Sequence, residues 1–64
     1  MPGLETLAHG IYGEYAYDEK QGWYCLLCDR NGRQVGETGC DADIGVIKTA
    51  AQALARAINR ERRG

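Results

Sequence analysis

The stretch from Trp23 to Val35 constrains the fold of this chain most, because it has the pattern of two strands joined by a tight turn. A two-residue loop at Asn31–Gly32 would place Arg30 opposite Arg33, and like charges at a cross-strand position are unfavourable. A loop of three residues avoids this repulsion. The sequence therefore favours the longer loop.

The three-residue loop also sets the register of the hairpin. Asp29 begins a type I turn, and Gly32 takes the left-handed conformation that follows it. Asp29 then lies opposite Arg33, and Leu27 lies opposite Val35. Because side chains alternate between the two faces of a strand, one face is predicted to carry Trp23, Cys25, Leu27 and Val35. The other face is predicted to carry Tyr24, Leu26 and Cys28.

A long amphipathic helix follows the sheet. Apolar residues at spacings of three and four form its stripe, which consists of Ile44, Ile47, Ala51, Leu54 and Ile58. Asp41 or Asp43 can cap its start. Thr49 offers a rival start with the pattern of a capping box, but the stripe favours the long helix.

Together these patterns predict an α+β fold, a three-stranded antiparallel sheet with a C-terminal helix packed on one face, in the order β-β-β-α. Residues 11–17 supply the first strand and residues 33–38 the third. Residues 11–64 are expected to form the single domain. Residues 1–10 are expected to be a separate N-terminal segment, either mobile or a helical turn.

The predicted sheet has apolar residues on both faces, but one helix covers only one of them. A chain of 64 residues buries only about 60% of its unfolded surface and is often completed by a partner. Large apolar side chains on an uncovered face mark a partner surface. The residues predicted to bind a protein partner are Tyr12, Tyr15, Tyr24, Leu26 and Cys28. Alternatively, the N-terminal segment folds over this face with Leu4 and Leu7.

The expected function is therefore a small, non-catalytic protein-interaction module that self-associates, as a homodimer, and binds a partner of unknown identity. The chain contains no Ser, which excludes a serine nucleophile. We expect no enzymatic activity and no cofactor. There is no apolar run long enough to span a membrane and no secretory signal pattern, so a cytoplasmic protein is expected.

The charge distribution favours a second candidate function. Residues 1–47 carry three basic against eight acidic residues, a sum of −5, whereas residues 48–64 carry five basic residues against one acidic residue, a sum of +4. A basic helix end can bind nucleic acid through phosphate contacts. The residues predicted for this alternative are Lys48, Arg56, Arg60 and Arg63.

The three cysteines and one histidine offer a third candidate, a small zinc protein. The alternative ligand set is His9, Cys25, Cys28 and Cys40, the inventory of a Cys₃His site. Residues three apart in a strand face opposite ways, however. We therefore expect one buried and one surface cysteine in the strand, with no metal.

From Trp23 to Ile58 the layout resembles the C-terminal part of a double-stranded RNA-binding domain. The resemblance lies in the hairpin at Asn31–Gly32, the glycines at 36 and 39, and the run 48–55, Lys-Thr-Ala-Ala-Gln-Ala-Leu-Ala. It implies binding to RNA phosphates from the basic start of the helix.

The order of strand, hairpin, Gly-Cys-Asp and Ala-rich helix is also similar to that of HicB-type antitoxin folds, in which a curled sheet with a helix binds a toxin. The size, Tyr content and charge asymmetry resemble those of small phage-encoded inhibitors, including some anti-CRISPR proteins. These resemblances imply a phage or bacterial regulator or inhibitor.

Overall fold

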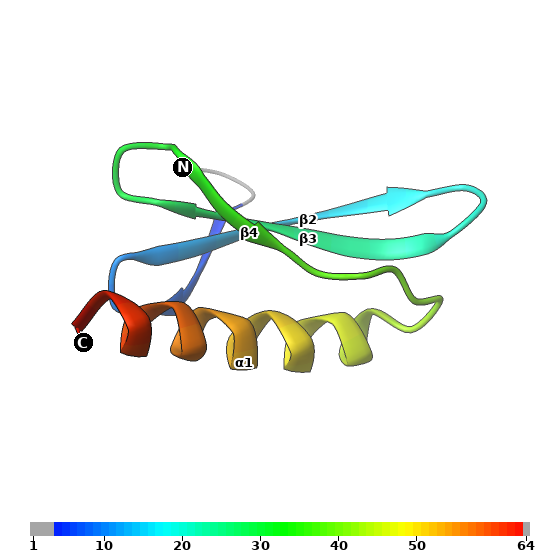
Figure 1. Ribbon diagram of the computed structural model, residues 1–64. Coiled ribbons are helices and arrows are strands. Elements are labelled where there is room, and N and C mark those ends of the chain that lie inside the picture. The colour runs from blue at the N-terminus through cyan, green and yellow to red at the C-terminus, as the bar shows by residue number, and fades with distance from the viewer. Residues whose placement is uncertain (1–3, 64) are drawn as a thin grey trace.

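The computed structural model describes residues 4–63, without the side chain of Arg63, as an antiparallel sheet with one helix against it (Figure 1). The elements are β1 (Leu4–Ala8), β2 (Ile11–Asp18), β3 (Gly22–Asp29), β4 (Gln34–Glu37) and α1 (Ile44–Arg63). The sheet order is β1-β2-β3-β4, so each strand pairs with its neighbour in sequence. The α+β class with a C-terminal helix is confirmed, but the prediction of three strands is wrong, because the sheet has four.

The additional strand is β1, which pairs along the outer edge of β2 with Leu4 opposite Glu14. Its register shifts at Leu7, whose side chain packs against the core on the helix side of the sheet. Gly13 leaves the space for it, since a Cβ there would lie only 2.7 Å from Leu7 Cδ1. The helical turn considered for this segment is therefore wrong.

The β3–β4 turn has the predicted conformation. Gly32 has a φ of +81°, and its N–H donates to the Asp29 carbonyl at 3.0 Å. The Asp29 carboxylate accepts hydrogen bonds from the N–H groups of Arg33 and Asn31, at 3.0 and 2.9 Å. These bonds, with Arg33 the largest contributor, hold the pKa of Asp29 below its ordinary value. Asp29 is therefore the residue that closes this turn.

The register beyond the turn differs from the prediction by one residue. Leu27 lies opposite Gly36, because a bulge shifts the pairing between Leu27 and Cys28. The predicted pairing of Leu27 with Val35 is therefore wrong. Val35 still packs against the core, on the same side as Leu27.

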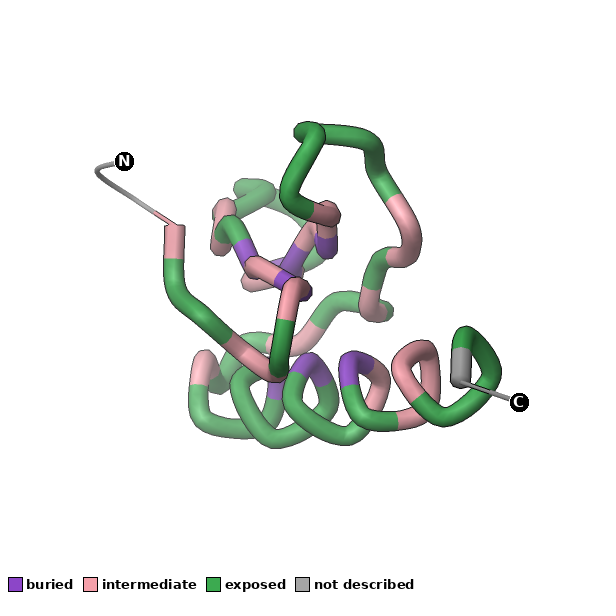
Figure 2. The backbone as a smooth tube through the Cα atoms, turned by 90° about the vertical axis from the view of Figure 1, so that its left-hand side faces the viewer, coloured by how far each residue is buried: buried purple, intermediate pink, exposed green. Residues whose placement is uncertain are grey.

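The core lies between α1 and one face of the sheet, and Figure 2 shows the buried segments of the helix turned toward the strands. Its buried apolar residues are Ile11, Cys25, Leu27, Ile47, Ala51 and Ala55. Asp43 caps α1, since its Oδ1 accepts a hydrogen bond of 2.8 Å from the N–H of Gly45. The long helix is thus confirmed, and the rival start at Thr49 is wrong.

The connection between β4 and α1 remains attached to β3. Trp23 and Asp41 exchange two backbone hydrogen bonds, of 2.7 and 3.0 Å. The Cys25 N–H also donates to Thr38 Oγ1 at 2.9 Å. These bonds place the start of α1 beside the β2–β3 hairpin, so the helix runs back along the strands (Figure 1).

The close approach at Gly13 makes a test of the β1 packing. A Cβ there would lie 2.7 Å from Leu7 and 2.9 Å from Cys25 Sγ, whereas one at Gly36 would lie no closer than 3.3 Å, to Ile58. We expect Gly13→Ala to lower the free energy of unfolding by about 1–3 kcal/mol, through overpacking, and Gly36→Ala to lower it less. Urea denaturation followed by circular dichroism measures both.

Gly39→Ala is the control, since a Cβ at Gly39 would meet nothing within 4 Å. If Gly13→Ala were no more destabilising than this control, Leu7 could not occupy the space above Gly13, and the placement of β1 would be wrong.

Candidate functional site

The face of the sheet turned away from α1 carries two rows of side chains across the strands. One row consists of Thr6, Tyr12, Cys28 and Gln34, and the next consists of Leu4, Glu14, Leu26 and Glu37. Ala16 and Tyr24 form a further pair. We call these residues the open face, because no other element of residues 4–63 lies against them (Figure 1).

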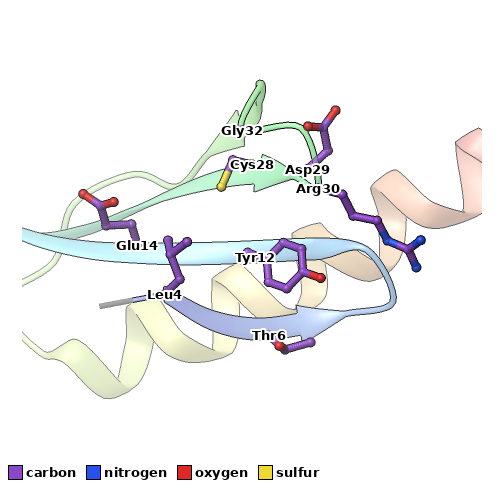
Figure 3. Close-up of a pocket in the computed structure, with 8 residues that line it drawn as sticks. All are labelled: Leu4, Thr6, Tyr12, Glu14, Cys28, Asp29, Arg30 and Gly32. Carbon is purple, nitrogen blue, oxygen red and sulfur yellow. The ribbon is translucent and has the colours of Figure 1, made fainter. Parts of the chain in front are cut away.

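Two hollows lie on the open face. The larger has a volume of about 510 Å³, and its side chains are drawn in Figure 3. It is lined by Leu4, Thr6, Tyr12, Glu14, Cys28, Asp29, Arg30 and Gly32. The second measures about 360 Å³ and is lined by Asp18, Tyr24, Leu26, Glu37, Thr38 and Cys40. The open face is thus an uneven surface that mixes apolar, aromatic and acidic side chains.

Four of the five residues predicted to bind a protein partner come together on the open face, namely Tyr12, Tyr24, Leu26 and Cys28. The fifth, Tyr15, does not, because it pairs with Cys25 on the α1 side and packs against the core. Its ring lies 5.9 Å from Lys48 Nζ, and its buried hydroxyl finds no hydrogen-bond partner among the described residues. Burial, followed by the charges of Glu5 and Cys25, raises its pKa. The expectation that Tyr15 shares a face with Tyr12 and Tyr24 is wrong.

The sequence analysis missed the part of the open face that β1 supplies. Leu4 and Thr6 lie beside Glu14 and Tyr12 and help to line the larger hollow. The β-branched side chain of Thr6, which favours strands, was the available signal. Because β1 lies at the edge of the sheet, it widens the open face. The alternative in which this segment folds over that face is wrong for residues 4–10.

The open face is acidic. Glu14 and Glu37 lie in its central row, and Asp18 lies on the same side at the end of β2, two residues after Ala16. The basic residues predicted to bind nucleic acid lie on α1, across the sheet, where Lys48, Arg56 and Arg60 are exposed. Arg63 ends the helix, and its side chain lies outside the described residues. Nucleic-acid binding by these residues stays a prediction.

The structure disperses the residues of the alternative zinc site. Cys25 is buried beneath α1, Cys28 lies on the open face, Cys40 is exposed, and His9 lies in the β1–β2 turn. Within the described part of the chain no group of three His, Cys, Asp or Glu side chains is placed to hold a metal ion. The expected separation of Cys25 from Cys28 is confirmed.

Comparisons of the chain with protein-family models, with curated proteins and with solved structures found no match. The described residues contain no helix with the length and apolar character needed to cross a membrane.

The three environments predict three rates of cysteine alkylation. At pH 8, iodoacetamide should modify exposed Cys40 first, half-buried Cys28 more slowly and Cys25 only when the chain unfolds. Burial raises the pKa of Cys25 to about 11, so only about one thousandth of this thiol is the reactive thiolate at that pH. Peptide mass spectrometry over time measures the order, and early labelling of Cys25 would contradict the packing of α1.

The same raised pKa links stability to pH. Below about pH 7.5, one unit under the ordinary cysteine pKa of about 8.5, the Cys25 thiol keeps its proton in both the folded and the unfolded chain, so its contribution to stability is complete. As the pH rises toward 11, the thiol ionises in the unfolded chain before it ionises in the folded chain, where its pKa is about 11. The free energy of unfolding therefore falls over this range. The fall in melting temperature between pH 9 and 11 should therefore be steeper for the wild type than for Cys25→Ala.

Proposed function

We propose that this chain is a small, non-catalytic protein-interaction module whose open face binds a basic, partly apolar segment of a partner protein. The observation that carries the proposal is the composition of that face. An antiparallel sheet with one face toward water usually has polar side chains there. Here Leu4, Tyr12, Tyr24 and Leu26 occupy it, only half-buried by their neighbours.

The charges on the open face indicate the chemistry of the partner. Glu14 lies between Leu4 and Leu26 in the central row, and Glu37 lies on the other side of Leu26. Apolar and acidic side chains thus alternate across four strands. A segment that alternates apolar residues with Lys or Arg would complement both features.

The same charges bear on self-association. Two copies that pair face to face would bring the carboxylates of Glu14 and Glu37 toward their counterparts, and like charges across an interface are unfavourable. A basic partner therefore fits this face better than a second copy. The expected homodimer stays a prediction, and a dimer formed in this way would strengthen as acid neutralises the carboxylates.

The positions of the reactive groups support a non-catalytic role. The Cys25 thiol is buried, with a pKa raised to about 11, and His9 lies at the turn end of the molecule, in contact with Arg30. Free cysteines suit a reducing, cytoplasmic setting.

A small domain with one docking face could act as a regulator or inhibitor by occupying its partner's surface.

Leu26→Glu tests the proposal. The isotope-labelled chain is titrated by NMR with a synthetic peptide in which Lys alternates with Leu. We expect amides of the open face to shift, and Leu26→Glu to weaken binding by about tenfold or more, because an apolar anchor at the centre of the face is lost. The substitution adds negative charge, so electrostatic attraction alone would predict tighter binding.

Gln52→Glu is the matched control, because it adds the same charge at an exposed position of α1 and should leave binding unchanged. A peptide with Glu in place of Lys should not bind. Equal affinity for both variants, or shifts confined to α1, would refute a docking site on the open face. Light scattering of the wild type across pH 4 to 8 separates self-association from partner binding.

A further inference from the structure

A polar cluster lies at the end of the molecule where two turns meet the last turns of α1. Arg30 Nη2 lies 3.0 Å from His9 Nε2, so the β3–β4 turn contacts the β1–β2 turn. Asn59 Nδ2 donates to the His9 carbonyl at 2.9 Å. Arg62 Nη2 lies 3.6 Å from Asp29 Oδ2. These side chains surround a hollow of about 300 Å³, and we call them the arginine cluster.

These contacts hold Arg30 over the hollow and leave some of its guanidinium N–H groups without a partner among the described residues. A guanidinium group only donates hydrogen bonds, so His9 Nε2 is the acceptor, and the remaining N–H groups of Arg30 can serve a ligand. The Arg30 side chain also crosses Gly10, where a Cβ would lie 3.5 Å from its Nε. The neighbouring turn thus positions Arg30 by the hydrogen bond to His9, and Gly10, which lacks a Cβ, leaves room for the Arg30 side chain.

The carboxylate of Asp29 leaves the N–H groups of Arg62 free to bind a ligand. Asp29 Oδ1 already accepts two backbone hydrogen bonds, from Asn31 and Arg33. The 3.6 Å between Arg62 and Asp29 exceeds the length of a direct hydrogen bond. Two arginines against one aspartate leave the side chains around the hollow with a net charge of +1.

We propose that the arginine cluster binds a phosphoryl group, held between the guanidinium groups of Arg30 and Arg62. Guanidinium groups donate pairs of parallel N–H groups that match phosphate oxygens. This site does not depend on the proposed protein-binding function, and Leu26→Glu should leave it intact. It lies at the C-terminal end of α1, away from the basic helix start to which the RNA-binding resemblance points.

The affinity should be modest. Arg62 is 46% exposed, so water and salt screen its charge. The unpaired carbonyl groups at the end of α1 add a partial negative charge. We expect a dissociation constant on the order of 1 mM for inorganic phosphate at low ionic strength.

An NMR titration with sodium phosphate, against sodium chloride at equal ionic strength and pH, tests the site. Phosphate should shift the amides of His9, Arg30 and Asn31 and the side-chain amide of Asn59. Arg30→Gln and Arg62→Gln should each weaken binding at least fivefold. Lys20→Gln removes one positive charge from an exposed position of the β2–β3 loop and should leave binding unchanged.

Equal shifts with phosphate and chloride, or an equal loss of binding in Lys20→Gln, would overturn the proposal. Melting curves of each variant show whether it is folded. A duplex RNA oligonucleotide then identifies the source of the phosphoryl group. RNA that binds more tightly than phosphate and depends on Arg30 and Arg62 indicates a nucleic-acid backbone, whereas RNA that binds no more tightly indicates a small free phosphate compound.

Discussion

Alternation of side chains along β3 is the constraint on which the rest of the structure depends. Cys25 and Leu27 point toward α1 and are fully buried, while Leu26 and Cys28 point to the other side. A single helix of 20 residues can cover only one face of a four-stranded sheet. The strand is apolar on both sides, so the covered side becomes the core, and apolar side chains remain on the open face, on which the proposed function rests.

Local chemistry made the β3–β4 hairpin and α1 predictable, because both are fixed by residues close in sequence. The turn needs Asp29 as an acceptor and Gly32 at positive φ, and the helix follows its apolar stripe. β1 was missed because Leu4 and Leu7, three positions apart, have the spacing of one helical face, whereas in the strand they lie on opposite sides of the sheet. The space that receives Leu7 exists only where Gly13 lies beside it in the folded sheet.

In the candidate sites, too, the features set by neighbouring residues could be predicted, whereas those set by contacts between distant parts of the chain could not. Tyr24, Leu26 and Cys28 followed from alternation, whereas Tyr12 and Tyr15 were grouped by residue type, although positions three apart in a strand lie on opposite faces. The pairing of Asp18 with Gly22 fixes the register of β2 and sets Tyr15 opposite Cys25. The length of the loop between β2 and β3 does not by itself determine how these two strands pair. The arginine cluster was out of reach, since His9 and Asn59 are separated by 50 positions along the chain.

The acidic residues of the open face and the basic residues of α1 lie on opposite sides of the sheet, so each group sets the electrostatic potential of its own surface. The molecule measures about 36 × 22 × 15 Å, whereas charges in physiological salt are screened over about 8 Å. Arg56 and Arg60, exposed on α1, therefore do little to neutralise Glu14 and Glu37 on the open face. A partner approaching the sheet meets an acidic surface, although the net charge of the chain is only −1. This local field, rather than the net charge, determines which ligands each surface attracts.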